Sequence, residues 1–187
     1  KFGNPVYINN DGDLFAYGEA LGGALPEVNA RLEALGSPKK YKNLVGYTFG
    51  TGLGAGLILD GRLYSGIGDS AGECGHIRLA PFGPVGFGKA GSFEGFCSGG
   101  GIAQLAAVRV REQLQLGNRV AWCPSPEAIP GLNAKIVGDA AGAGDPLALA
   151  VYAECGAYLG RGLAVLIDLL NPELIVIGSV FARSESL

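Results

Sequence analysis

The chain has 187 residues, of which 48% are hydrophobic and 17% are charged, and its formal net charge is −3. This composition excludes a disordered chain, and the low number of basic residues offers no positively charged surface for nucleic acid. The sequence has no apolar run near the ~18 residues that a membrane span needs. Glycine accounts for 33 of the 187 residues, about 18%, against a usual share of ~7%. The glycines follow no G-X-Y period, so we expect tight turns rather than a collagen-like repeat.

The cysteines and the missing methionine bear on the cell compartment and on completeness. The four cysteines lie more than twenty residues apart, which predicts neither a C-x-x-C metal site nor a dense disulfide framework. Buried free thiols in a reducing cytoplasm are the better interpretation. These cysteines are Cys74, Cys97, Cys123 and Cys155. The chain contains no methionine, even at position 1, and we therefore interpret it as a piece of a longer protein.

The N-terminal part of the chain predicts a strand, a helix and a loop. Residues 6–9 form a β-prone run, and residues 14–25 are compatible with a helix. Asp11 stands where the strand gives way to the helix. Residues 36–43, with a proline and three lysines, are the clearest polar loop.

The middle of the chain predicts a β-hairpin or meander followed by an irregular segment. Short apolar runs at residues 44–49, 56–59 and 63–64 are separated by a glycine-rich turn and by an Asp60-Gly61 turn. Residues 80–91 contain two prolines and four glycines, which predicts a loop without regular structure.

Helices are expected to dominate the C-terminal half. Residues 102–116 have apolar residues at helical spacing, and residues 118–130 are expected to be irregular. Residues 146–170 predict a long helix, with Asp145 as its cap and Pro146 at its first position.

The long helix and the segment after it predict a layered arrangement. Gly156 and Gly160 would form a stripe that lets another backbone approach closely, and Asp168 interrupts the apolar run, so no membrane span is expected. Residues 174–177 are typical of a strand buried on both faces, closed by Gly178. A helix followed by a buried strand predicts an α/β fold.

The first candidate motif is the glycine-rich turn at residues 48–56, Thr-Phe-Gly-Thr-Gly-Leu-Gly-Ala-Gly. Without Cβ atoms, such a turn can aim several N–H groups at an anion, with phosphate as the natural guest. A hairpin that merely needs positive φ angles explains the motif equally well. A dinucleotide fold is less favoured, because residues 57–59 look like a strand rather than a helix.

The second candidate motif, Ala71-Gly72-Glu73-Cys74-Gly75-His76, contains the only histidine of the chain. Carboxylates and imidazoles commonly hold the hydroxyls of polyols such as sugars. A lone histidine is more often structural, but Glu73 and the downstream Glu94 shift the balance toward a sugar site. For Glu94 itself, an acidic residue favoured by the helix dipole is the structural alternative.

The third candidate motif is Asn10-Asp11. A carboxylate near a hydroxyl and a positioned phosphate can accept the hydroxyl proton during phosphoryl transfer. Asp13 is the nearby competitor for this role. A helix N-cap is a structural role that is at least as well supported for Asp11.

Two further segments follow these three motifs along the chain: Gly91-x-x-Glu94 and residues 171–178 (Asn-Pro-Glu-x-Ile-Val-Ile-Gly). In order and spacing, the whole set resembles the ROK family of sugar kinases and sugar-responsive repressors. The resemblance covers nearly the whole chain and is closest to a zinc-less hexose kinase. It implies an actin-like, RNase H-like α/β fold whose two lobes close over ATP and sugar. The chain would be incomplete at both ends and hold mostly the C-terminal lobe, with residues 1–30 as the hinge and the end of the N-terminal lobe.

The resemblance also implies roles for individual residues. Asp11 matches the catalytic base, and Asn10 matches its sugar-binding neighbour. The other residues that match sugar ligands are Glu73, His76 and Glu94. The residues that match the second phosphate loop are Gly50, Thr51, Gly52 and Gly54, and Gly178 matches the turn beside the adenosine.

The chain departs from the family pattern in two ways. Many members carry a C-x-C-G-x-x-G-C-x-E zinc motif, but Val85, Phe87 and Ser92 replace its three cysteines here. His76, which matches the fourth ligand, could not hold zinc alone, so we expect no structural metal and a loop packed around Phe87 and Phe93. The family's N-terminal Asp-x-Gly-Gly-Thr phosphate loop is absent, so the chain by itself is expected to bind ATP poorly and turn over little.

The leading functional hypothesis is a cytoplasmic, ATP-dependent hexose kinase similar to glucokinases. Mg²⁺ would arrive with ATP, a small-molecule sugar would be the substrate, and a homodimer would be the assembly. A sugar-sensing repressor without kinase activity is the main alternative, and a non-catalytic sugar-binding relic is the third. The retained Asn10-Asp11 pair and the lost zinc cysteines favour the kinase. No nucleic-acid partner is expected for this segment.

Overall fold

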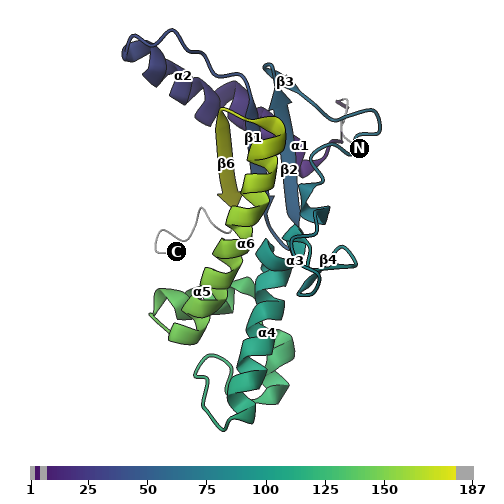
Figure 1. Cartoon of the computed structure of the whole chain (residues 1–187), viewed down its shortest axis with the longest axis vertical. Coiled ribbons are helices and arrows are strands. Elements are labelled where there is room, and N and C mark those ends of the chain that lie inside the picture. Colours follow the sequence, from purple (N-terminus) through teal and green to yellow (C-terminus); the bar gives the residue numbers. More distant parts are fainter. Residues whose placement is uncertain (1–2, 5–7, 180–187) are drawn as a thin grey trace. The chain divides into compact units, whose positions relative to one another are not determined.

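The computed structural model describes residues 3–4 and 8–179 (Figure 1). The chain forms two compact units. The first unit comprises Lys1–Thr48, Gly54–Glu73 and Pro172–Val176, and the second comprises Phe49–Leu53, Cys74–Asn171 and Ile177–Leu187. The strand predicted at residues 6–9 lies largely outside the described residues.

A four-stranded sheet, with most of its residues in the first unit, has the strand order β3-β2-β1-β6. The strands are β1 (Leu44–Phe49), β2 (Leu53–Leu59), β3 (Arg62–Leu63) and β6 (Leu174–Ser179). The consecutive strands β1, β2 and β3 are neighbours, and β2 pairs antiparallel with β3. The predicted meander is therefore confirmed.

Strand β6 departs from the prediction of a strand buried on both faces. It lies at the edge of the sheet in the described part of the chain, and residues 174–177 are only half-buried. An edge strand has a neighbour on one side only, which leaves it open to solvent. Gly178 is buried inside the strand and does not end it, so its predicted position is also wrong.

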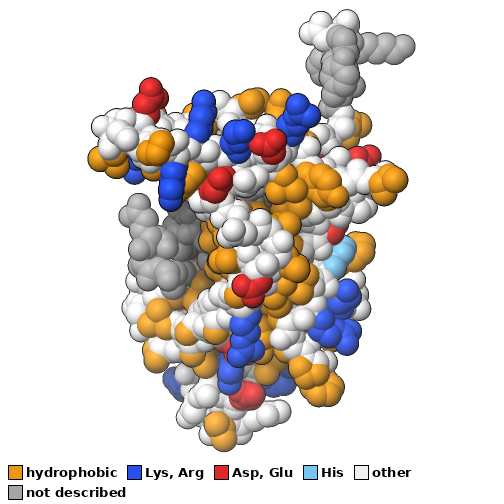
Figure 2. Space-filling view, turned by 45° about the horizontal axis from the view of Figure 1, so that its top comes forward, with side chains coloured by type: hydrophobic (Ala, Val, Ile, Leu, Met, Phe, Trp, Pro, Cys, Tyr) orange, Lys and Arg blue, Asp and Glu red, His pale blue; other side chains and the backbone are white. Residues whose placement is uncertain are grey.

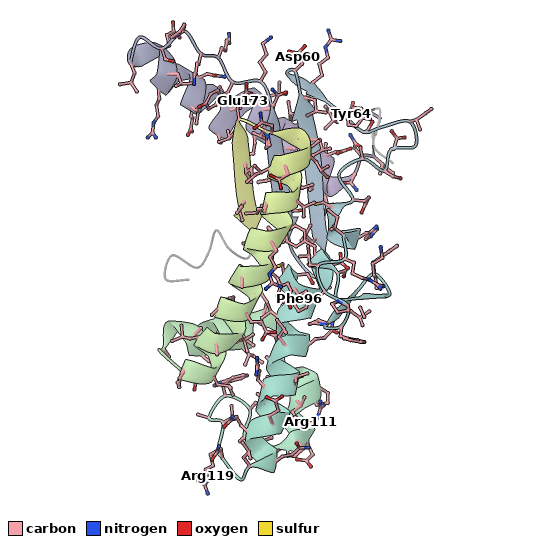
Figure 3. The ribbon with its side chains drawn as sticks, in the orientation of Figure 1. Asp60, Tyr64, Phe96, Arg111, Arg119 and Glu173 are labelled. Carbon is pink, nitrogen blue, oxygen red and sulfur yellow. The ribbon has the colours of Figure 1, made fainter. Side chains whose placement is uncertain are left out.

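Glu173 ties the start of β6 to the start of β1, and Figure 3 shows it at that end of the strand. Its Oε2 accepts the backbone N–H groups of Lys42 and Asn43, both at 2.7 Å. The bond from Lys42 is the main reason that the pKa of the Glu173 carboxyl lies below its usual value. The glutamate of the Asn-Pro-Glu motif is thus held by backbone amides.

The helix predicted at residues 14–25 is in fact two helices, α1 (Asp11–Gly22) and α2 (Ala24–Ala34). They are separated at Gly23, where the Glu19 carboxylate accepts the N–H of Ala24 at 2.8 Å. This side-chain acceptor satisfies an amide at the start of α2 and lets a new helix begin there. One hydrophobic cluster of the first unit is formed by the buried residues Ala16, Leu25, Leu44 and Ile58.

The second unit is mainly helical. Its helices are α3 (Phe93–Cys97), α4 (Gly99–Gln115), α5 (Ala134–Gly142) and α6 (Pro146–Leu170), with 3₁₀ turns η1 (Cys74–His76) and η2 (Pro126–Gly131). Helix α6 contacts α3, α4 and α5. Its predicted bounds and cap are confirmed, because the Oδ1 of Asp145 accepts the N–H groups of Leu147 and Ala148 at 3.0 and 2.9 Å.

Other predictions for the second unit need correction. Helix α4 begins three residues earlier than predicted, and α5 was not predicted at all. The segment 80–91 is not wholly irregular, because it contains the antiparallel strands β4 (Val85–Gly86) and β5 (Lys89–Ala90). The four cysteines are buried and free, as predicted.

By length and composition alone, α6 is the one helix among the described residues that could cross a membrane. The sequence interpretation set this aside because Asp168 interrupts the apolar run. Helix α6 packs against three other helices of its unit. The residues of α6 that this packing buries are Ala148, Val151, Tyr152, Cys155, Gly162 and Leu166.

The glycines of α6 behave differently from the prediction. A Cβ atom at Gly156 or Gly160 would meet nothing within 4 Å, so no described segment approaches there. The close approach is at Gly162, where a Cβ atom would lie 2.5 Å from ring carbons of the buried Phe93. Helices α3 and α6 therefore pack closely where the Phe93 ring of α3 lies on Gly162 of α6.

We expect Gly162→Ala to destabilise the protein by about 1–2 kcal/mol, since overpacking costs ~1–3 kcal/mol and the helix gains up to ~1 kcal/mol from alanine. The matched variants Gly156→Ala and Gly160→Ala lie on the same helix in open space and should stabilise it by up to about 1 kcal/mol. Urea unfolding of the three variants measures the difference. Equal effects at all three positions would contradict the ring-on-glycine contact.

Candidate active site

Asp11 is the first residue of α1, and Asn10 is the N-cap of this helix. The Oδ1 of Asn10 accepts the N–H groups of Gly12 and Asp13 at 2.8 and 3.2 Å. The capping role considered for Asp11 therefore belongs to Asn10. Asp11 is exposed, and its Oδ1 accepts the Gly12 N–H at 3.0 Å. Within the described part of the chain, its Oδ2 has no hydrogen-bond partner.

The glycines next to Asp11 and Glu73 both lie against the same residue of β2. A Cβ atom at Gly12 would lie 2.8 Å from the Ala55 nitrogen, and one at Gly72 would overlap the Ala55 oxygen. Helix α1 and the segment before Glu73 thus touch the strand backbone to backbone. Because Asp11 adjoins Gly12 and Glu73 adjoins Gly72, the backbone of both acidic residues lies close to the same strand residue in the first unit.

Asp13, the competitor of Asp11, is only 4% exposed, and its Oδ1 has no hydrogen-bond partner among the described residues. Burial raises the pKa of its carboxyl, and the negative charges of Asp69 and Glu73 raise it further. A general base has to reach its substrate. The exposed Asp11 meets this condition better than Asp13 does.

Glu94, in the second unit, is bound to the end of the glycine-rich turn. Its Oε2 accepts the N–H of Leu53 at 3.0 Å, and a Cβ atom at Gly52 would lie 2.8 Å from the same oxygen. Glu94 also lies in the first turn of α3, where the helix dipole favours a negative charge, so the structural role considered for it applies as well. One carboxylate therefore serves both the helix and the turn.

The glycine-rich turn leaves fewer amides for an anion than its sequence suggests. The Gly50 N–H donates to the Gly52 carbonyl at 3.0 Å, while the carbonyls of Gly50 and Thr51 accept the N–H groups of Gly99 and Gly100 at 2.8 and 3.2 Å. The N–H groups of Thr51 and Gly52 have no partner in the residues that the structure describes. These two amides are the ones that the turn leaves available to an anion.

Gly54 and Gly178 do not join that turn. Gly54 lies inside β2, where a Cβ atom would be 2.8 Å from the Thr48 Oγ1 and 3.6 Å from the Asp11 Oδ1. Gly54 is therefore a neighbour of Asp11 in the first unit. Gly178 is buried in β6, and no described contact links it to the other candidate residues.

His76 ends the 3₁₀ turn η1 in the second unit. Its neighbour Gly75 packs on Glu94, with a Cβ atom 3.3 Å from the Glu94 Cβ, and this contact brings His76 and Glu94 together. The His76 ring stacks on Phe87, with ring centroids 4.6 Å apart. The sequence interpretation missed this stack, although a phenylalanine between two glycines is a signal for a tight turn.

The predicted loop packing is half correct. Phe93 is fully buried, but Phe87 is 80% exposed and contributes no core packing. Within the described residues, no three His, Cys, Asp or Glu side chains gather as a metal site.

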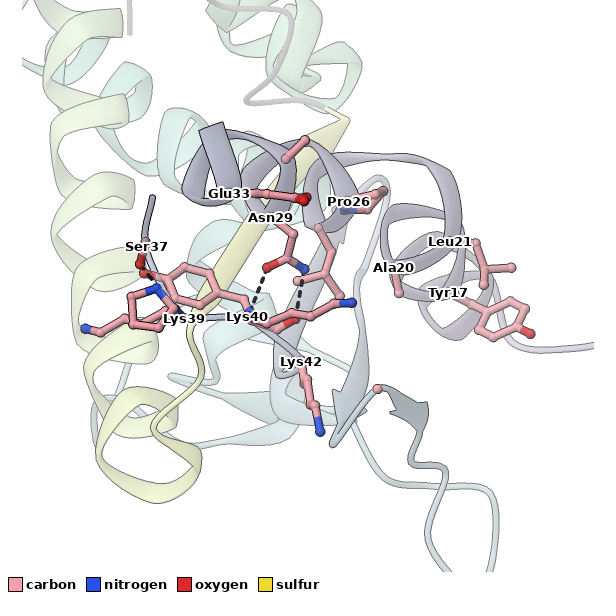
Figure 4. A pocket seen from close by; sticks show the side chains of 15 residues that line it. Tyr17, Ala20, Leu21, Pro26, Asn29, Glu33, Ser37, Lys39, Lys40 and Lys42 are labelled. Atoms are coloured by element: carbon pink, nitrogen blue, oxygen red, sulfur yellow. Dashed lines mark hydrogen bonds between the residues drawn. The ribbon is translucent and has the colours of Figure 1, made fainter. Parts of the chain in front are cut away.

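The first unit contains a groove of about 680 Å³ (Figure 4). It is lined by α1, α2 and the loop before β1, and Asn29 fixes that loop by donating to the Tyr41 carbonyl at 3.0 Å and accepting the Tyr41 N–H at 2.7 Å. None of the predicted site residues lines this groove, so we assign it no role in the reaction.

A sequence model of the ROK family matches residues 1–187. The glucokinase of Halalkalibacterium halodurans is 36% identical over 182 residues, which cover 96% of this chain and 50% of that protein. The DNA-binding transcriptional repressor Mlc of Escherichia coli is 28% identical over 186 residues, 99% of this chain and 40% of that protein. The chain thus spans about half the length of the curated glucokinases that it matches.

The structure of a ROK family glucokinase from Streptomyces griseus in complex with glucose and AMPPNP is similar at a TM-score of 0.74 and 28% identity, covering 97% of this chain and 54% of that one. The α/β prediction is confirmed, and the fold is the actin-like fold of ROK sugar kinases.

We expect Asp13→Asn to stabilise the protein at pH 7. A raised pKa in the folded state means that the stability contributed by protonated Asp13 is complete below the unfolded pKa of ~3.9 and is lost as the pH rises through the folded pKa. A neutral amide avoids this loss at pH 7 and gains nothing below about pH 4. Urea unfolding of both proteins at the two pH values measures the effect, and a difference that is independent of pH would contradict the raised pKa.

Proposed function

Because this chain belongs to the ROK family, we propose that the complete protein is an ATP-dependent kinase that phosphorylates a hexose hydroxyl. The observation that carries the proposal is the exposed Asp11 carboxylate, held on the first turn of α1 by the contact between Gly12 and Ala55. The similarity to curated glucokinases at 36% and 32% identity supports a sugar as the acceptor.

Asp11 acts as the general base. Its Oδ1 is occupied by the Gly12 N–H at 3.0 Å, which fixes the plane of the carboxylate and directs Oδ2 to the substrate. Oδ2 accepts the proton of the sugar hydroxyl as the hydroxyl oxygen becomes the nucleophile.

The sugar hydroxyls are bound by Asn10, Glu73, His76 and Glu94. The cap hydrogen bonds occupy the Oδ1 of Asn10, so its Nδ2 is the group left to donate to the sugar. The Leu53 amide occupies the Oε2 of Glu94, so Oε1 is its acceptor. Carboxylate and imidazole groups accept and donate in the patterns that adjacent hydroxyls require.

The glycine-rich turn contributes to ATP binding. The N–H groups of Thr51 and Gly52 are oriented donors without a partner among the described residues, which fits a phosphate oxygen. The glucose and AMPPNP in the complex of the Streptomyces griseus relative support the same ligand classes here. ATP supplies the phosphoryl group, and Mg²⁺ bound to its phosphates offsets their charge.

The complete protein is proposed to act in the cytoplasm as a homodimer. The chain spans about half the length of its curated glucokinase relatives, so a second phosphate-binding segment is proposed to lie in the remainder. We therefore expect little turnover from the chain alone.

A sugar-sensing transcriptional repressor is the second candidate function. It is favoured by the similarity to Mlc, which covers 99% of this chain. The two functions differ in a simple assay, because a repressor would bind sugar without releasing ADP.

We expect Asp11→Asn in the complete protein to lower kcat by about 10²–10⁴-fold, since the amide cannot accept the proton, while the sugar Kd changes little. Coupled ADP release with a panel of hexoses gives kcat, and calorimetry gives Kd. Asp13→Asn is the matched control, two residues away and buried, and should retain most of the rate. An Asp11→Asn variant with the wild-type rate would exclude Asp11 as the base.

A further inference from the structure

The hairpin formed by β4 and β5 has an unusual residue at its tip. Val85 pairs with Ala90 and Gly86 pairs with Lys89, which leaves Phe87 and Gly88 as a two-residue turn. Both turn residues have positive φ angles, 46° and 73°. This combination is that of a type I′ turn, which favours Asn-Gly, and a bulky side chain at positive φ is an outlier.

Packing in the core does not explain Phe87. Its side chain is 80% exposed, so it gains little from burial. Its ring instead stacks on the His76 imidazole, with centroids 4.6 Å apart and planes inclined by 16°. Figure 2 shows the chain's single histidine, in pale blue, on the surface next to a hydrophobic side chain. A strained aromatic residue with one specific contact is expected to serve that contact.

The rest of the hairpin holds the same neighbourhood. The Lys89 Nζ donates to the His76 carbonyl at 2.7 Å, so the backbone of His76 is fixed as well as its ring. A Cβ atom at Gly86 would lie 2.8 Å from the Glu94 Cβ, so the hairpin also packs against Glu94, another candidate sugar ligand. The hairpin therefore contacts both His76 and Glu94 within the second unit.

We propose that Phe87 is a positioning residue that holds the His76 imidazole in the orientation in which it binds a sugar hydroxyl. This inference rests on the proposed sugar-binding role of His76. Phe87 acts through the imidazole and has no contact with the reacting atoms. Without the ring, the imidazole loses this stacking contact and more of its ordering falls to the sugar-binding step, so sugar affinity falls while the chemical step is unchanged.

The decisive variant is Phe87→Asn, because Asn-Gly suits the type I′ turn while the aromatic ring is lost. In the complete protein we expect KM for the sugar to rise about tenfold, as for one side chain immobilised on binding, with kcat within about twofold and an unchanged or higher unfolding midpoint. Phe87→Tyr keeps the ring and should restore the wild-type KM. A wild-type KM in Phe87→Asn, or a parallel loss of kcat and stability without rescue by tyrosine, would overturn the proposal.

The stack itself has a spectroscopic readout. The His76 ring protons, identified by their loss in His76→Gln, should show an aromatic ring-current shift in the wild type and in Phe87→Tyr, and lose it in Phe87→Asn. An unchanged shift in Phe87→Asn would overturn the stack.

If the wild-type protein phosphorylates no sugar, the proposed kinase function fails, and calorimetric sugar affinity then replaces KM. A tenfold weaker Kd in Phe87→Asn would still support the positioning role, and equal affinity would overturn it.

Discussion

The backbone contact at Ala55 is the constraint on which the candidate site of the first unit depends. Gly12 and Gly72 lie so close to Ala55 that a methyl group on either would overlap its backbone, and Gly56 meets the Gly12 carbonyl in the same way. Asp11 and Glu73 are the direct chain neighbours of two of these glycines. The backbone of both acidic residues is therefore placed by close main-chain packing, which leaves little room for it to shift.

The second unit positions its candidate residues differently. Here the contact is made by a side chain, because the Glu94 carboxylate accepts the Leu53 N–H, and a Cβ atom at Gly52 would lie 2.8 Å from the same Oε2. Gly75 and Gly86 also pack on the Cβ of Glu94, so the turn, the η1 segment and the Phe87 hairpin all contact this one residue. The high glycine content is thus explained by specific close approaches as well as by turns. Gly156 and Gly160, which meet nothing, show that glycine alone does not identify such an approach.

The sequence predicted local features well and tertiary ones poorly. The meander and α6 follow from alternating apolar runs and from the Asp145-Pro146 start signal, which act over a few residues. The break at Gly23 depends on the Glu19 carboxylate, and the exposure of residues 174–177 depends on the position of β6 in the sheet. In the candidate site, motifs identified the residue types, but the bond between Leu53 and Glu94 joins positions 41 residues apart and could not be predicted from either segment.

The contact between Gly12 and Ala55 places Asp11 at the start of α1, and kcat of Gly12→Ala in the complete protein tests this placement most directly. A methyl group 2.8 Å from the Ala55 nitrogen has to displace α1, and a shift of about 1 Å at a catalytic group costs ~10²-fold in rate. Gly18→Ala, on the same helix in open space, is the control and should keep the wild-type rate. A loss of about 10²-fold in Gly12→Ala alone is the predicted result, and equal kcat values for both variants would contradict the account.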